Sequence, residues 1–475
     1  MNFTQTLAAF AASLRFEEIP ANALHAGKRL VQDTLGCVVA GYDMPSSRIV
    51  REVKAASGGA PEATVLVTGT LVPVATATYV NAHAGNAIDA DDTLHYKAHI
   101  AAALVPPALA MAERQGSSAR DFLAAVIAGY EVAGRIAMSL QSLVMTAEGN
   151  FQFAAVSGYS CVAFAATVAA GRLLGLDASQ MLNAFGITAA TAPLPASSQF
   201  GLVLPRPMTK YAMYGTTAEA GVVAALLAQR GFTSEHSVFD GDKGFWRVVG
   251  SAGCNWSMLA DRLRERWLVE EVIYKVYPGC RFLNAAVDMF YALRSEHGFN
   301  VADIDSIDVG VHGAALAKHM DDPNVVTMVD ACFSAPYLLA AAAYAGAPGP
   351  NWHTQQMRDA ARLRAFMQKV SVTLEPTSAA IAAEDLQALG HNARMPSSIR
   401  IVTKRGTFSA RTEYSRGDPY TAASACSDAD LERKFRDFCE PILSRSSIDA
   451  ALAAVSALDA AAGVATLVNS LVVPS

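Results

Sequence analysis

The spacing of apolar residues changes once along this chain, and that change constrains the fold more than any other feature. From Ala21 to about Arg230, apolar side chains recur every three or four residues, the period of a helix with one buried face. Ser118 and Asp177 stand where helix N-caps are expected, each followed three residues later by an acid or an amide. The first half is therefore predicted to be nearly all helical.

After Gly241 the pattern becomes mixed. Apolar and polar residues alternate in short segments, as they do in half-buried strands; these segments are Ile304 to Val311, Val370 to Val372, Ile399 to Ile401 and Phe408 to Tyr414. Helices are predicted among them at Asn284 to Glu296, Phe333 to Ala345 and Asp359 to Met367. Helical periodicity returns after a capping box at Ser427 to Asp430, and again from Ile448 to Leu471.

This order of elements predicts a mainly α fold. A large all-helical domain is formed by both chain ends, residues 1–272 and 408–475, and a smaller α+β domain, residues 273–407, is inserted between them. A chain of 475 residues is long enough for such a division.

Composition excludes several classes of protein. Hydrophobic residues make up 52% of the chain and charged residues 17%, so most of it must be buried, and some apolar surface is expected to be hidden in an oligomer. The net charge of −6 comes without any run of basic residues, which argues against nucleic acid as a partner. Seven scattered cysteines without a C-x-x-C spacing predict reduced, mostly buried thiols and a cytoplasmic protein.

Three apolar segments could be mistaken for targeting or membrane sequences. The first sixteen residues have helical spacing and lack a basic start, so an amphipathic helix is expected instead of a signal peptide. The uncharged stretches 150–171 and 331–352 are long enough to span a bilayer. Polar residues in the first and prolines in the second favour buried core helices, and no membrane partner is expected.

The densest polar cluster runs from Asn86 to His99, between apolar helices. Burying so many ionisable groups is costly unless they are paired or functional. If the segment is helical, Asp89 and Thr93 share one face, while Asp91, His95 and His99 share another. His99 is then a candidate for a base that works near neutral pH.

Three interpretations of this cluster compete. His95 and His99 could bind a metal with a carboxylate, but Tyr96 stands where zinc hydrolases carry a glutamate base. Asp89-x-Asp91-Asp92 could be the proton-donating motif of helical terpene cyclases, although an aromatic content of 8% is low for such pockets. A capped turn with solvated acids is the structural alternative, which the segment in isolation favours.

Motifs spread over nearly the whole chain decide among these interpretations. They are Asp33 to Gly36, Asn86 to His99, Gly129 to Arg135, Arg172 to Asp177, Lys210 with Gly215, Gly231 to Thr233, Gly244-Phe245, Lys275 to Cys280, Phe333 to Tyr337, Gly417 to Pro419 and Lys434-Phe435. In this order they resemble the MmgE/PrpD family, the group of 2-methylcitrate dehydratase, cis-aconitate decarboxylase and iminodisuccinate epimerase.

The resemblance implies a homodimer in which the smaller domain is lid-like. It implies small di- or tricarboxylate substrates and no required metal or organic cofactor. The shared step adds or removes a proton beside a carboxylate or at an adjacent alkene carbon. Loss of water, loss of carbon dioxide or epimerisation follows.

The family's active-site positions fall on six residues of this chain: Asp89, Thr93, His99, Lys210, Lys275 and Tyr337. The resemblance implies that Lys210 and Lys275 bind substrate carboxylates, with Lys210 also close to the chemistry. His99 transfers the proton and Asp89 orients it. Thr93 donates to a substrate carboxylate, and Tyr337 donates a hydrogen bond or a proton.

Two histidines common in the family are absent from this chain. Residues 151–156 contain none, and Asn284 stands where another is expected. The chain also has Ile100 where a proline commonly follows the histidine, and it lacks the Trp/Glu-rich insertion associated with 2-methylcitrate dehydratases. These departures argue against 2-methylcitrate as the substrate. The predicted function is a cofactor-independent lyase, a dehydratase or decarboxylase, acting on a small di- or tricarboxylic acid. An epimerase or isomerase is the alternative, and a catalytically inactive carboxylate-binding member is the second alternative.

Overall fold

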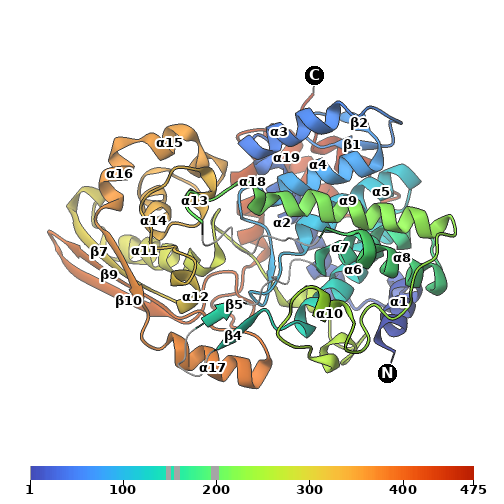
Figure 1. Ribbon diagram of the computed structural model, residues 1–475. Coiled ribbons are helices and arrows are strands. Elements are labelled where there is room, and N and C mark those ends of the chain that lie inside the picture. Colours follow the sequence, from blue (N-terminus) through green and yellow to red (C-terminus); the bar gives the residue numbers. More distant parts are fainter. Residues whose placement is uncertain (1, 146–150, 154–160, 194–202, 475) are drawn as a thin grey trace.

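The computed structural model describes residues 2–145, 151–153, 161–193 and 203–474. Helices account for 56% of the structure, which confirms the prediction of a mainly α fold. Figure 1 shows two parts side by side, one built of helices and one containing a sheet. The chain termini lie on opposite sides of the helical part.

The helices of the first half cover most of its length. They are α1 (Phe3–Ser13), α2 (Ala21–Gly41), α3 (Pro45–Ala55), α4 (Val74–Asn86), α5 (Val105–Gln115), α6 (Ala119–Ser139), α7 (Val162–Leu173), α8 (Ala178–Thr191), α9 (Thr209–Gln229) and α10 (Phe245–Val248). Two small hairpins accompany them, formed by β1 (Ala63–Val65) with β2 (Thr70–Val72) and by β4 (Leu143–Met145) with β5 (Phe151–Phe153). The predicted N-terminal helix is confirmed as α1.

Helix α7 packs between α6 and α9 in the core of the helical part. Glycines allow this close approach: a Cβ on Gly221 of α9 would lie 2.5 Å from the Ala163 carbonyl oxygen, and one on Gly129 of α6 would lie 2.8 Å from that of Ala165. The predicted N-caps are also confirmed, because Ser118 accepts a hydrogen bond from the backbone of α6 and Asp177 from that of α8. Local signals thus fixed where these helices begin.

The sheet belongs to residues 284–412, which we call the sheet domain. Its strands are β7 (Ile304–Val311), β8 (Val370–Leu374), β9 (Ser397–Thr403) and β10 (Gly406–Thr412), in the order β10-β9-β7-β8. Only the β7–β8 pair of this sheet is parallel. Its helices are α11 (Asn284–His297), α12 (Gly313–Leu316), α13 (Met328–Cys332), α14 (Ala335–Tyr344), α15 (Gln355–Asp359), α16 (Ala361–Met367) and α17 (Ser378–Leu389).

The four predicted strands are present, but some boundaries differ from expectation. β10 pairs with β9 along its whole length, so the sheet continues five residues beyond the expected domain limit at 407. The helix expected over 359–367 is divided between α15 and α16. In the stretch 150–171, where a core helix is expected, residues 151–153 form β5 and α7 covers the end from Val162, while 150 and 154–160 lie outside the described residues.

The last helices return to the helical part. They are α18 (Asp428–Cys439), α19 (Arg445–Ser456) and α20 (Ala465–Ser470), so the helix expected over 448–471 is interrupted. α18 packs against α2. There the buried Lys434 ammonium donates to Asp33 at 2.6 Å and to the Ala90 carbonyl at 2.7 Å. The two chain ends are thus joined by a buried ion pair.

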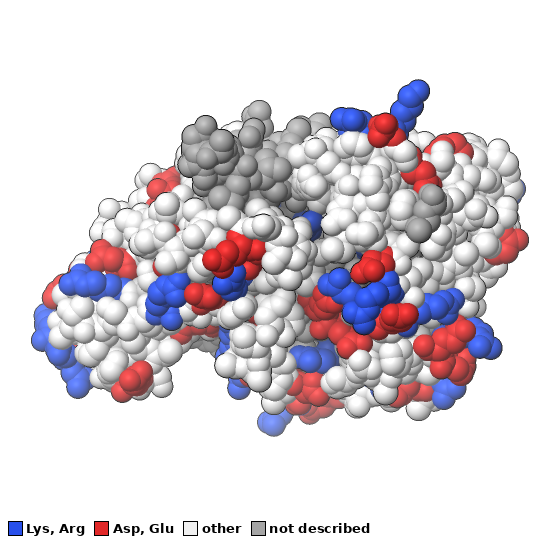
Figure 2. All heavy atoms as spheres, turned by 90° about the horizontal axis from the view of Figure 1, so that it is seen from below, with Lys and Arg blue, Asp and Glu red and all other residues white. Residues whose placement is uncertain are grey.

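Among the described residues, one helix, α6, is long and apolar enough to cross a membrane, but its apolar window is entirely buried within the protein, as in the core helix of a globular fold. On the face shown in Figure 2, basic and acidic side chains lie next to each other, and neither sign forms a broad area. All seven cysteines are free thiols, and five of them are buried, as predicted.

Lys434→Met should destabilise the protein by about 3–5 kcal/mol, because the substitution leaves the Asp33 carboxylate buried without its cation. Urea unfolding at pH 7 measures this loss. Arg436→Met is the matched control, since Arg436 lies on the same helix but pairs with the exposed Glu432 and Asp449. Its cost should stay below about 1 kcal/mol. Equal losses for the two variants would contradict the importance of the Lys434 pair.

Candidate active site

The polar segment after α4 is a series of turns, and the helical interpretation of residues 86–99 is wrong. α4 ends at Asn86, and Asp89, His95 and Tyr96 have φ values of 54°, 46° and 58°. A right-handed helix has no place for such residues. The short strand β3 (Thr93–Leu94) lies between the turns and pairs with β6 (Val272–Ile273). The backbone therefore folds back on itself, and helical spacing does not decide which side chains meet.

Asp89 is at the centre of the site, between two lysines from distant segments. The Lys210 ammonium, from the first turn of α9, lies 3.1 Å from Oδ2 of Asp89. The Lys275 ammonium contacts Oδ1 and lies 2.9 Å from the Asp89 carbonyl oxygen. All three side chains are buried. Burial alone would raise the pKa of Asp89, but the two ammonium groups outweigh it and the pKa is lowered.

Asp91 forms a second layer of this charge network. Its Oδ1 accepts a hydrogen bond from the Asn86 amide at 2.6 Å and lies 3.9 Å from the Lys275 ammonium. The other atom of the same amide, Oδ1 of Asn86, accepts from Lys210 at 3.3 Å. Asn86 therefore connects Asp91 with Lys210. Burial raises the pKa of Asp91 to about 6 despite the nearby lysines.

His99 is held beside this network in a defined tautomer. Its Nδ1 lies 2.6 Å from the Asp92 carbonyl oxygen and 3.6 Å from Oδ1 of Asp91. A carbonyl oxygen can only accept, so Nδ1 carries the hydrogen and Nε2 carries the lone pair of the neutral ring. Burial, and then Lys275 and Lys210, lower the pKa of His99 well below its ordinary value. His99 is thus a neutral base whose Nε2 can accept a proton.

The Asp92 carboxylate fixes the chain around His99. It accepts from the backbone N–H of Ala101 at 2.8 Å, from that of Ile100 at 3.3 Å, and from the Tyr130 hydroxyl at 3.0 Å. Burial and the neighbouring Asp91 raise the pKa of Asp92 to about 7. Asp92 is therefore a positioning residue for the turn that carries His99.

His95 faces a different environment from His99. Its Nε2 lies 2.6 Å from Glu271, its Nδ1 lies 2.7 Å from the Tyr420 hydroxyl, and its ring lies 4.0 Å from that of His391. His391 belongs to the sheet domain, and Glu271 and Tyr420 belong to the chain segments before and after it. The turn that carries His95 therefore contacts all three segments. Because its two ring nitrogens are engaged there, His95 does not join His99 in the metal pair considered from the sequence.

Asp89, Asp91 and His99 could in principle offer one ligand atom each to a cation, since those atoms lie within 4.8 Å of one another. The charges argue against it. The two ammonium groups on Asp89 occupy its oxygens and would repel a divalent ion at the same place. The donor set fits anion binding by lysines better than metal binding.

The other two predicted site residues make contacts of their own. The Thr93 hydroxyl donates to the Ala98 carbonyl at 3.2 Å and so closes the turn before His99. The Tyr337 hydroxyl donates to the Trp352 carbonyl at 2.5 Å, and its ring stacks on His353 within the sheet domain. The structure brings Asp89, His99, Lys210 and Lys275 together. Thr93 supports their turn, and Tyr337 packs inside the sheet domain.

Sequence reasoning missed several members of the site. Asn86 and Asp91 were visible only as parts of a motif, and no role in the site was assigned to Asn86. Asn284, at a position where the family often has histidine, is buried, accepts from Arg281 and donates to the Cys280 carbonyl. The second family histidine is absent from residues 151–156. Of these, residues 154–156 lie outside the described residues.

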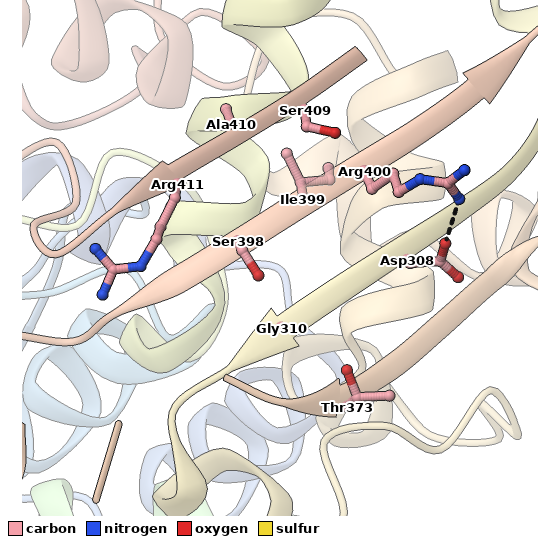
Figure 3. A pocket seen from close by; sticks show the side chains of 9 residues that line it. All are labelled: Asp308, Gly310, Thr373, Ser398, Ile399, Arg400, Ser409, Ala410 and Arg411. Carbon is pink, nitrogen blue, oxygen red and sulfur yellow. Dashed lines mark hydrogen bonds and ion pairs between the residues drawn. The ribbon is translucent and has the colours of Figure 1, made fainter. Parts of the chain in front are cut away.

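The open outer face of the sheet carries a hollow of about 490 Å³, formed by strands β7 to β10. Figure 3 shows its side chains, including Arg400 paired with Asp308 at 3.1 Å. The lining contains none of the residues that surround Asp89. It is a shallow surface above neighbouring strands, and the convergent charges at Asp89 are the better indication of an active site.

Comparison with known proteins defines the class. Residues 5–255 match the MmgE/PrpD N-terminal domain, and residues 277–460 match the MmgE/PrpD C-terminal domain. The chain therefore belongs to the MmgE/PrpD family, as its motifs predict. Four of the residues predicted for the site, Asp89, His99, Lys210 and Lys275, are gathered by the fold in one buried cluster.

The particular relatives are named as decarboxylases. The chain is 24% identical over 472 residues to cis-aconitate decarboxylase of Homo sapiens, covering 96% of this chain and 92% of that protein. It is 30% identical over 310 residues to cis-aconitate decarboxylase of Aspergillus terreus, covering 62% and 60%. A cis-aconitate decarboxylase-like protein of Aspergillus oryzae is 29% identical over 264 residues, covering 53% and 52%. The match thus spans about half the length of the Aspergillus oryzae relative.

Asp92→Asn should change how stability depends on pH. A carboxyl group whose pKa is raised by folding stabilises the protein at low pH, and that contribution is lost as pH rises from about 4 through its folded pKa near 7. The side-chain amide of the variant cannot ionise, so the variant does not lose this contribution to its stability as pH rises. Urea unfolding of wild type and variant at pH 5 and pH 8 should therefore show a smaller stability difference at pH 8. A difference that grows with pH would contradict the assignment.

Tyr337→Phe tests whether the Tyr337 hydroxyl takes part in chemistry. The hydroxyl is buried on the Trp352 carbonyl, so its removal should lower the free energy of unfolding by roughly 1 kcal/mol. Turnover should stay at the wild-type level. Thermal unfolding and steady-state kinetics check the two effects. Lost turnover with an unchanged unfolding midpoint would instead show that the hydroxyl acts on the substrate.

Proposed function

We propose that this protein is a lyase that acts on a small di- or tricarboxylic acid without a metal or organic cofactor, and that the reaction is a decarboxylation. One observation carries the proposal: two buried lysines converge on one carboxylate directly beside a neutral histidine. The names of relatives that match nearly the whole chain favour decarboxylation over dehydration.

The lysines would bind the substrate's carboxylates. An ammonium group provides a point charge with three donors, and both Lys210 and Lys275 point to the same small volume around Asp89. An incoming carboxylate can share these donors, because each lysine has more N–H groups than Asp89 accepts. The three side chains are buried, so a carboxylate bound there would be largely shielded from water.

His99 would transfer the proton. In a decarboxylation, the bond between a carbon and its carboxylate breaks and carbon dioxide leaves. The electron pair of that bond stays on the carbon, which then binds a proton. Lys210 and Lys275 lower the pKa of His99, and a substrate anion that neutralises their charge reverses this effect. Substrate binding would thus raise the pKa of His99, so that the ring can hold the proton and deliver it from Nε2.

Dehydration would use the same atoms in another order. Nε2 of His99 would remove a proton from the carbon beside a carboxylate, and hydroxide would leave from the neighbouring carbon. Epimerisation would need that proton to return to the opposite face of the same carbon. The three reactions therefore share His99 as the group that transfers the proton, but they differ in their products.

The experiment is incubation of the protein in deuterated water with a panel of di- and tricarboxylates that includes cis-aconitate, followed by NMR. Decarboxylation predicts loss of carbon dioxide together with one solvent deuteron on carbon. Release of water, or deuterium exchange with inversion, would assign the dehydratase or the epimerase instead. Activity should survive EDTA. If every acid is inert, the protein is a catalytically inactive carboxylate binder.

His99→Ala should lower kcat by about 10²- to 10⁴-fold, the contribution of a positioned acid or base. Binding of a non-reacting tricarboxylate should stay within a few-fold, because Lys210 and Lys275 remain. Steady-state kinetics and calorimetry separate the two quantities. His236→Ala is the control, since His236 is exposed and contacts Asn183. Wild-type kcat in the His99 variant would refute its role in proton transfer.

A further inference from the structure

Lys318 follows α12 in the sheet domain, and its backbone is anchored by a residue from the helical part. The guanidinium of the buried Arg206 donates to the carbonyl oxygens of Lys318 at 2.7 Å and His319 at 2.9 Å. The backbone N–H of Arg206 donates to the buried Asp330 at 2.8 Å. The position of Lys318 is thus fixed relative to the segment that leads into α9, four residues before Lys210.

An aromatic ring brings the two cations of this segment together. The Arg206 guanidinium lies 5.5 Å from the centre of the Phe333 ring, and the Lys210 ammonium lies 5.6 Å from it. The Phe333 ring therefore contacts both cations. Arg206 binds the Lys318 backbone, and Lys210 contacts Asp89. The loop with Lys318 must lie on the same side of the sheet domain as the lysine site.

A second connection comes through the segment after Lys275. The Gly279 N–H donates to the Asp89 carbonyl at 3.1 Å, and the Cys280 N–H donates to the Cys332 carbonyl at 2.8 Å. The short helix η7 (Arg281–Leu283) that follows packs against α12. The loop that carries Lys318 therefore starts from a helix that packs beside the segment after Cys280, and the neighbour of Cys280, Gly279, is bonded to Asp89.

The Lys318 side chain interacts electrostatically with Cys280, Lys210 and Asp89. Burial, together with the positive charge of Lys210, lowers the pKa of Lys318, as expected for a cation close to another cation. Around Asp89 the protein thus places three ammonium groups, those of Lys210, Lys275 and Lys318, with the carboxylates of Asp89 and Asp91. Two of these ammonium groups contact Asp89, and the third, which belongs to the sheet domain, interacts with Asp89 through its charge.

We propose that Lys318 is a specificity residue that binds a third carboxylate of the substrate, so that the site selects tricarboxylates over dicarboxylates. This inference rests on the proposed function. A tricarboxylate would reach from Lys210 and Lys275, at the helical part, to Lys318 in the sheet domain. A dicarboxylate satisfies only the first two lysines, and it gains little from the third.

The test compares two probes that differ by one carboxylate, tricarballylate and glutarate, by calorimetry with the full chain. Lys318→Met should weaken tricarballylate binding by at least about tenfold, the usual loss of one charged hydrogen bond, and change glutarate binding by less than about twofold. Lys318→Arg keeps the charge and should retain the preference. Lys404→Met, at an exposed lysine of the same domain, should bind both probes as wild type does.

The outcomes separate this inference from the function it rests on. If wild type binds neither probe, the proposed carboxylate site is wrong. If wild type binds both but Lys318→Met weakens both equally or neither, only the role of Lys318 is wrong. Circular dichroism of each variant checks folding, and Lys318→Gln replaces the methionine variant if that protein is unfolded.

Discussion

The structure depends on the compensation of one buried charge. Asp89 lies in a left-handed turn after α4, and its carboxylate is buried between the ammonium groups of Lys210 and Lys275. Removing any one of these charges would leave another uncompensated in a medium where isolated ions are very costly. The three segments that carry them, the turn after α4, the start of α9 and the chain after β6, are therefore fixed relative to one another. The site is a consequence of that constraint.

Further buried pairs extend the constraint outward. Lys434 of α18 bonds to Asp33 of α2 and to the Ala90 carbonyl, so the C-terminal helices support the turn that carries Asp89. Asp92 holds the backbone of residues 100 and 101 and thereby orients His99, while Arg206 ties Lys318 to the approach of α9. Each of these side chains bonds to backbone groups as well as to another side chain, which makes the arrangement specific in geometry.

The sequence alone predicted most of the fold. Helical spacing in the first half, alternation at β7 to β10 and the caps at Ser118, Asp177 and Ser427 are local signals, because they depend on residues close along the chain. They located nearly every long element. They do not decide features that depend on tertiary contacts: β10 extends to Thr412 because its hydrogen bonds are made with β9, and the segment 86–99, for which helix and turn were both considered, forms turns.

For the site, the sequence determined which residue types were available, and the family motifs singled out Asp89, Thr93, His99, Lys210, Lys275 and Tyr337. The tertiary structure decided which of them meet. Asp89 and Lys275 are 186 positions apart, and Asn86 and Lys210 are 124 apart, so no local pattern could reveal that they share hydrogen bonds. The same holds for Lys318, which had no motif, and for Tyr337, whose hydroxyl bonds to Trp352. Pairing of buried charges is a long-range requirement, and only the folded chain shows how it is satisfied.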